Sequence, residues 1–194
     1  MSDLSNEPDR RARVLRAALA VFARYGFRKT SMEEVARAAD LSRQGLYLLF
    51  GDKEALFRAA IGRMIDDGLA AVDVELARDA PIGPRLYGAM KAWYGRSVGT
   101  PAQNADELFA RSVALLRGEM ERSGEAVVER LEAAIAASPL ADRLAERGLS
   151  PADAARTLEA CGLGLKHAGL TREAFKARLA AAVSLAVGAP VRAA

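Results

Sequence analysis

Apolar residues recur along this chain at the three- and four-residue spacing of amphipathic helices. The first such pattern predicts a helix over about residues 10–25, with the core-facing positions Leu15, Ala18, Leu19 and Phe22. No stretch alternates apolar and polar residues between turn signals, as a half-buried strand would. Alanine fills 42 of the 194 positions, which favours helices almost throughout. The pattern therefore predicts an all-α protein.

Two short helices are expected after the first one. Gly26 suits the left-handed position that ends a helix. Ser31 is placed to cap the second helix, because Glu34 follows at the spacing of a capping box. Asp40 lies where the chain must turn, and Asp tolerates left-handed backbone better than most residues. Ser42 then caps a third short helix.

The helices become longer after residue 53, beginning with one of about seven turns. Ser150 followed by Pro151 indicates a later helix start, and Thr171 begins the last helix. This contrast in helix length predicts a small N-terminal helical domain over residues 8–68 and a larger one over residues 69–194.

Two short helices joined by a tight turn, over about residues 31–50, are typical of a helix-turn-helix, which places its second helix in the major groove of DNA. The outward face of that helix carries Arg43, Gln44 and Tyr47. An arginine fork suits guanine, a glutamine amide suits adenine, and a phenol suits a phosphate oxygen. Lys53 begins the next helix, where a cation and backbone amides can hold another phosphate.

The order and spacing of these features resemble the DNA-binding domain of TetR-type bacterial regulators. The resemblance covers about residues 8–68 and is carried by Gly26-Phe27, Thr30-Ser31, Val35-Ala36, the run Leu41 to Phe50, and Lys53 to Phe57. It implies base contacts from Arg43, Gln44 and Gly45. It also implies phosphate contacts from Ser31, Tyr47 and Lys53. The expected DNA-binding set is Thr30, Ser31, Ser42, Arg43, Gln44, Gly45, Tyr47 and Lys53.

The resemblance also implies a role for the rest of the chain. In that family the larger helical domain binds a small molecule, and the last two helices, here about residues 151–187, pair with a second subunit. The implied function is a homodimeric transcriptional regulator, a repressor released from double-stranded operator DNA by an effector.

Two positions depart from the family pattern. Asp40 stands where glycine is common, and Leu49 stands directly before Phe50 where a histidine or tyrosine is common, with Leu48 preceding it. Two leucines cannot donate to phosphate. Either one of them packs inward, or one contacts a thymine methyl group or a sugar.

Several large side chains are candidates for lining an effector pocket, since such pockets are mainly apolar and aromatic. These candidates are Met64, Tyr87, Trp93, Tyr94 and Phe109. Aromatic residues at helical spacing are also typical of an ordinary core, so both readings stand. Gly162 and Gly164 either permit close helix packing across a dimer or are merely tolerated.

Composition narrows the function classes. The single cysteine, Cys161, excludes a disulfide framework and is interpreted as a small core residue. The single histidine, His167, is expected at a helix C-terminus or facing solvent, and no metal site or cofactor is expected. No phosphate-binding loop or nucleophile motif is present, so we expect no enzyme activity.

The formal net charge of +3 is unevenly distributed. Residues 10–53 carry ten basic and four acidic side chains, whereas residues 54–194 carry 18 of each. A basic N-terminal part joined to a helical part of zero net charge is typical of a DNA-binding protein.

No segment reaches the roughly 20 apolar residues of a membrane helix, and the polar N-terminus lacks signal-peptide features, so a cytoplasmic location is expected. The alternative is a helical ligand-binding or adaptor protein that no longer reads DNA.

Overall fold

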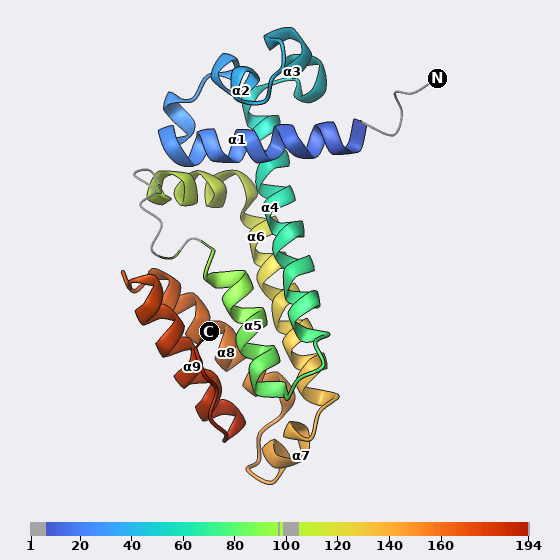
Figure 1. Ribbon diagram of the computed structural model, residues 1–194, viewed down its shortest axis with the longest axis vertical. Coiled ribbons are helices and arrows are strands. Elements are labelled where there is room, and N and C mark those ends of the chain that lie inside the picture. Colours follow the sequence, from blue (N-terminus) through green and yellow to red (C-terminus); the bar gives the residue numbers. More distant parts are fainter. Residues whose placement is uncertain (1–6, 97, 99–104, 194) are drawn as a thin grey trace. The chain divides into compact units, whose positions relative to one another are not determined.

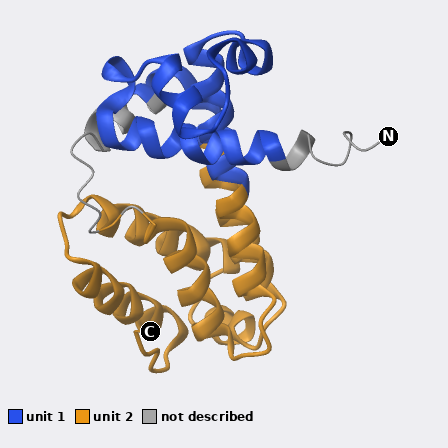
Figure 2. Cartoon of the chain, turned by 45° about the horizontal axis from the view of Figure 1, so that its top comes forward, with its two compact units in different colours: residues 1–66, 101–120 blue, residues 67–100, 121–194 orange. Residues whose placement is uncertain are grey.

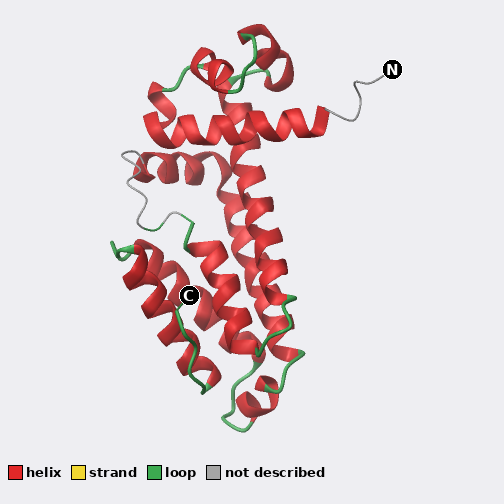
Figure 3. Cartoon of the chain, viewed as in Figure 1, coloured by secondary structure: helices red, strands yellow, loops and turns green. Residues whose placement is uncertain are grey.

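The computed structural model describes residues 7–96, 98 and 105–193, without the side chains of residues 7–9, 105–110, 112 and 113. The described residues form helices and no strand (Figure 3), which confirms the predicted fold class. None of the described helices is long and apolar enough to cross a membrane.

The chain divides into two compact units (Figure 2). The first comprises residues 1–66 and 101–120, and the second comprises residues 67–100 and 121–194. Helices α4 (Lys53–Leu76) and α6 (Ala105–Ala136) each run through a boundary between the units. Sequence patterning had suggested a single division after residue 68, because nothing in the helical periodicity of α6 marks its first half as a partner of the N-terminal helices.

The first unit contains α1 (Glu7–Lys29), α2 (Met32–Ala38), α3 (Arg43–Phe50) and the start of α4 (Figure 1). The predicted stripe on α1 is confirmed in the core, where Leu15, Ala18 and Phe22 are buried and Leu19 packs against them. Three aromatic rings, those of Phe22, Phe27 and Phe57, form the centre, with centroids 5.1–5.8 Å apart. Such a cluster fixes α4 against the end of α1.

The first half of α6 contributes to the same core. Leu116 is buried among the residues of α1 to α4, and the helix leaves ideal geometry there, with φ −136° and ψ 24°. The Arg58 guanidinium donates to the Leu115 carbonyl at 2.6 Å, and Arg111 forms an ion pair with Glu54. These contacts attach α6 to α4 within the first unit.

The second unit contains α5 (Ile82–Tyr94), α7 (Leu140–Ala145), α8 (Pro151–His167) and α9 (Arg172–Val187) with the remaining parts of α4 and α6. Helix α5 packs against α8 and α9, which also pack against each other. The predicted starts of the last two helices are confirmed. Ser150 forms a capping box with Asp153, and the Thr171 hydroxyl accepts from the Ala174 amide.

Three expectations about glycine and cysteine need correction or refinement. Gly26 has the predicted positive φ of 80°, but its ψ of 160° is extended, and the chain resumes helical geometry and ends α1 only at Lys29. Gly162 is buried, and an added Cβ would lie 2.5 Å from the ring of Tyr94, so this glycine permits close packing of α8 on α5 inside one unit. The prediction that Cys161 is a core residue is wrong, because it lies one position away on the exposed face of α8.

Candidate nucleic-acid interface

Helix α2 begins at the predicted capping box. The Ser31 hydroxyl accepts from the Glu34 amide at 3.2 Å, and the Glu34 carboxylate accepts from the Ser31 amide at 2.7 Å. A further bond from the Ser31 hydroxyl to that carboxylate is 2.9 Å long. These bonds favour the ionised carboxyl group and lower the pKa of Glu34, first through the Ser31 backbone amide and second through its hydroxyl.

The turn between α2 and α3 depends on Asp40. Its φ of 54° is the one positive value found at a non-glycine residue in the described chain, as expected for a turn that brings the next helix back. The Leu41 amide then donates to the Ala36 carbonyl at 2.9 Å, which closes the end of α2. Ser42 caps α3 by accepting from the Gly45 amide at 3.0 Å.

Helix α3 has two distinct faces. Leu46 and Phe50 are buried and hold it against the first core. Arg43, Gln44 and Leu48 are exposed, and so is 38% of Tyr47. The base- and phosphate-contacting side chains predicted on α3 thus share one surface on a helix whose other side is fixed.

Two of the exposed side chains of α3, Arg43 and Tyr47, contact each other. The Arg43 guanidinium lies 5.6 Å from the centroid of the Tyr47 ring, a cation–π contact between residues four apart. Gly45 lies in the first turn of the same helix, and an added Cβ there would meet the Ser42 hydroxyl at 3.1 Å. Glycine at this position therefore leaves the N-terminal cap of α3 undistorted.

Arg11, which the sequence patterning did not single out, supports the other end of α3. Its guanidinium lies 4.5 Å from the centroid of the Phe50 ring and donates to the Leu49 carbonyl at 3.4 Å. Arg11 stands four residues before Leu15 and so lies in line with the inward stripe of α1. A basic residue at such a position was the sequence feature that could have identified this contact. It anchors the last turn of α3 to α1.

Besides the capping residues Ser31 and Ser42, two more of the predicted DNA-binding residues have internal partners. Thr30 is only 2% exposed, and its hydroxyl donates to the Gly26 carbonyl at 2.8 Å. The Lys53 ammonium donates to the carbonyls of Phe27 and Thr30, each at 3.0 Å, and to that of Arg28 at 3.5 Å. The structure therefore places Thr30 and Lys53 inside the connection between α1 and α2 and does not bring them to the face that carries Arg43.

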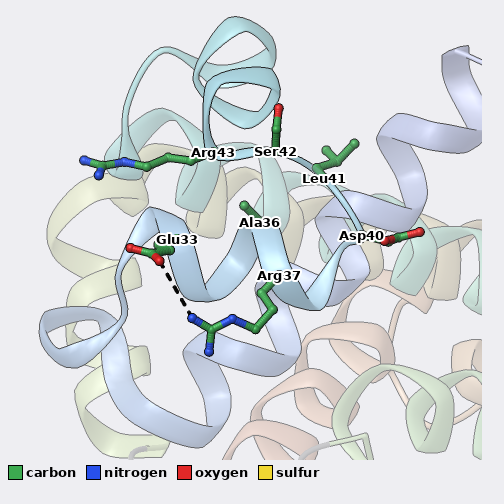
Figure 4. A pocket seen from close by; sticks show the side chains of 7 residues that line it. All are labelled: Glu33, Ala36, Arg37, Asp40, Leu41, Ser42 and Arg43. Carbon is green, nitrogen blue, oxygen red and sulfur yellow. Dashed lines mark ion pairs between the residues drawn. The ribbon is translucent and has the colours of Figure 1, made fainter.

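A hollow of about 620 Å³ lies beside the start of α3 (Figure 4). It is lined by Glu33, Ala36, Arg37, Asp40, Leu41, Ser42 and Arg43. Arg37 and Glu33 form an exposed ion pair at 3.8 Å, so two cations and two carboxylates balance the charge of the hollow. Figure 4 shows the Arg43 side chain extending away from the turn, on the opposite side from Asp40.

The predicted effector-pocket residues are distributed over both units. Tyr87 and Tyr94 are buried in the second core, and Trp93 packs against that core. The Tyr94 hydroxyl donates to the Glu159 carboxylate at 3.1 Å, and burial raises the pKa of Tyr94, as does the neighbouring charge. Met64 belongs to the first unit and is exposed, whereas the side chain of Phe109 lies outside the described residues.

Comparison with known proteins agrees with this geometry. The sequence profile of the family described as "Bacterial regulatory proteins, tetR family" matches residues 14–60, which run from α1 into α4. The uncharacterized HTH-type transcriptional regulator YfiR of Bacillus subtilis is 42% identical over 64 residues, which cover 33% of this chain and 31% of that protein. The match thus spans less than a third of the length of this curated relative.

Solved structures match the fold over most of the chain. A putative TetR-family transcriptional regulator from Rhodococcus sp. has a TM-score of 0.70 at 26% identity, over 92% of this chain and 99% of that one. A SmeT–triclosan complex has a TM-score of 0.63 at 20% identity, over 95% and 92%. Residues 14–60, which contain the helix-turn-helix, therefore match the N-terminal domain of the tetR family of bacterial regulatory proteins.

Proposed function

We propose that this protein is a sequence-specific regulator of transcription that binds double-stranded DNA. The observation that carries the proposal is the two-faced α3, whose buried Leu46 and Phe50 fix a helix that presents Arg43, Gln44 and Tyr47 to solvent. A helix of this kind fits the major groove, where an arginine fork pairs with guanine and a glutamine amide pairs with adenine. The net positive charge of residues 10–53 supplies attraction to phosphate.

The contacts within the first unit suggest two roles for its polar residues, contact with DNA and support of the backbone. Arg43 and Gln44 are the proposed base readers, and Tyr47 is the proposed phosphate contact. Thr30 and Lys53 instead support the backbone through hydrogen bonds to carbonyls of the first unit. Support from such residues limits the loss of conformational freedom when the helix binds.

The proposed active form is a homodimer that pairs through α8 and α9, because helix-turn-helix dimers read two half-sites about one helical turn apart. The exposed faces of these helices carry large apolar side chains, with Leu163 44% exposed and Leu185 79% exposed. Pairing would remove both from water. Full burial of an exposed leucine contributes about 1.5–3 kcal/mol, and Leu163, which is already more than half buried, would contribute less than Leu185.

The second unit is the proposed effector-binding part. Its core combines Trp93 and Tyr94 with a polar pair, because Tyr94 donates to Glu159. The structurally similar SmeT is known as a complex with triclosan, a small molecule. An effector that binds one arrangement of the dimer more tightly than another would shift the population away from the DNA-binding form.

The test is selection of DNA from a pool of random duplexes by the full-length chain, followed by binding measurements at several salt concentrations. Arg43→Ala and Gln44→Ala are each expected to relax discrimination at one base pair per half-site by about 1–3 kcal/mol. Arg37→Ala, which removes an exposed cation of α2, is the matched control and should leave base preference unchanged. Failure to enrich any sequence would contradict the proposal and favour a ligand-binding or adaptor protein.

A further inference from the structure

Leu48 is an unusual surface residue. It is 82% exposed, more than any other large apolar side chain in the described part of the chain. Its neighbour Leu49 is half-buried and packs against the first core. Of the two leucines that precede Phe50, Leu49 is therefore the one that packs inward, and Leu48 faces solvent from the end of α3.

The position of Leu48 on α3 places it beside the proposed base readers. Residues four apart lie on one face of a helix, so Leu48 follows Gln44 in one row while Tyr47 follows Arg43 in the next. The rise between Gln44 and Leu48 is about 6 Å at 1.5 Å per residue. Stacked base pairs are about 3.4 Å apart, so this rise corresponds to one or two base pairs.

The surroundings of Leu48 argue against a docking site for a protein or a membrane. Its exposed neighbours on α3 are Arg43, Gln44 and Tyr47, so Leu48 stands alone and is not part of a broad apolar patch. In the major groove one apolar group is available to such a side chain, the 5-methyl group of thymine. Contact with that methyl group would remove both from water.

We propose that Leu48 reads the 5-methyl group of a thymine that lies one or two base pairs from the adenine bound by Gln44. This inference rests on the proposed function and adds a specificity determinant to it. Burial of one methyl group corresponds to a change of about fourfold in the dissociation constant.

The experiment uses the full-length chain and the duplex enriched by selection. Each thymine of that duplex is replaced in turn by deoxyuridine, which removes only the methyl group. For the unsubstituted protein we expect about fourfold weaker binding at one position in each half-site. Leu48→Ala should bind the thymine and deoxyuridine duplexes equally at that position. Val74→Ala, which truncates a 68% exposed apolar side chain of α4 outside the proposed DNA and dimer contacts, should retain the fourfold difference.

The possible results separate the role of Leu48 from the DNA-binding function itself. A thymine position at which Leu48→Ala alone loses the methyl effect supports the proposal. An enriched duplex in which no deoxyuridine weakens binding, or in which Leu48→Ala shows the same loss as the unsubstituted protein, overturns the role of Leu48 and leaves the DNA-binding function intact. A pool from which nothing is enriched overturns both.

Discussion

Lys53 provides a direct test of how α4 supports α2 and α3, the proposed DNA-binding helices. Its ammonium group donates to the carbonyls of Phe27 and Thr30 at 3.0 Å and lies 4.6 Å from the centroid of the Phe27 ring. Lys53→Met retains most of the aliphatic chain and removes the charge and all three donors. The change therefore isolates the polar contacts from the packing of the side chain.

The expected loss of stability follows from these contacts. Hydrogen bonds from a charged group contribute about 1.5–3 kcal/mol each when buried, but Lys53 is partly exposed and water can replace its ammonium group at the carbonyls. About 1 kcal/mol for each of the two 3.0 Å bonds gives a total near 2 kcal/mol. For a chain of this size, that loss lowers the melting temperature by about 4–8 °C.

Urea and thermal unfolding followed by circular dichroism measure this loss, with Lys29→Met as the control because Lys29 is an exposed lysine in the last turn of α1. The salt dependence of DNA binding supplies the second readout. If Lys53 held a phosphate, its loss would reduce the slope of log K against log salt by about 0.9 per half-site. If Lys53→Met were as stable as the Lys29→Met control and also showed a reduced salt slope, the internal role would be refuted. The phosphate contact expected from the sequence would then be supported.

Two further predictions concern packing and pH. Gly162→Ala should destabilise the second unit by about 1–3 kcal/mol, because the added Cβ would overlap the Tyr94 ring. The control is Gly164→Ala, because the space around its Cβ is open in the described structure. Its melting temperature should match or exceed that of the unsubstituted protein. For Glu34, whose pKa is lowered by Ser31, the stabilisation is present above the carboxyl's unfolded pKa and is lost as pH falls through its lower folded pKa. The urea midpoint of Glu34→Gln should therefore lie below that of the unsubstituted protein at pH 7, and the two should converge toward pH 3; a constant gap between them would contradict the assignment.

Local sequence signals predicted the starts of α2 and α3 and the turn between them well because the determinants are local. The Ser31–Glu34 box, the left-handed Asp40 and the Ser42 cap each involve residues no more than three positions apart. The exposed face of α3 followed from the same periodicity. Residues that contact distant segments were harder to predict.

Lys53 illustrates the difference, because its partners lie 23 to 26 residues earlier in the chain. Periodicity placed it at a helix start but could not show that its ammonium group points toward the end of α1. Cys161 and Gly162 present the same difficulty on α8. Adjacent small residues fit either side of a helix, and only the position of Tyr94 identifies Gly162 as the buried one.

The passage of α6 through both compact units has a consequence for how this protein can be divided or recombined. Leu116 lies in the first core, so a fragment that stops near residue 68 would leave part of that core uncovered. A functional exchange of sensing modules between regulators of this architecture would therefore need paired crossovers, in α4 and again in α6. The proposed DNA-binding unit consists of two stretches of polypeptide, and a recombination experiment that transfers only the first of them would start from a fragment with an incomplete core.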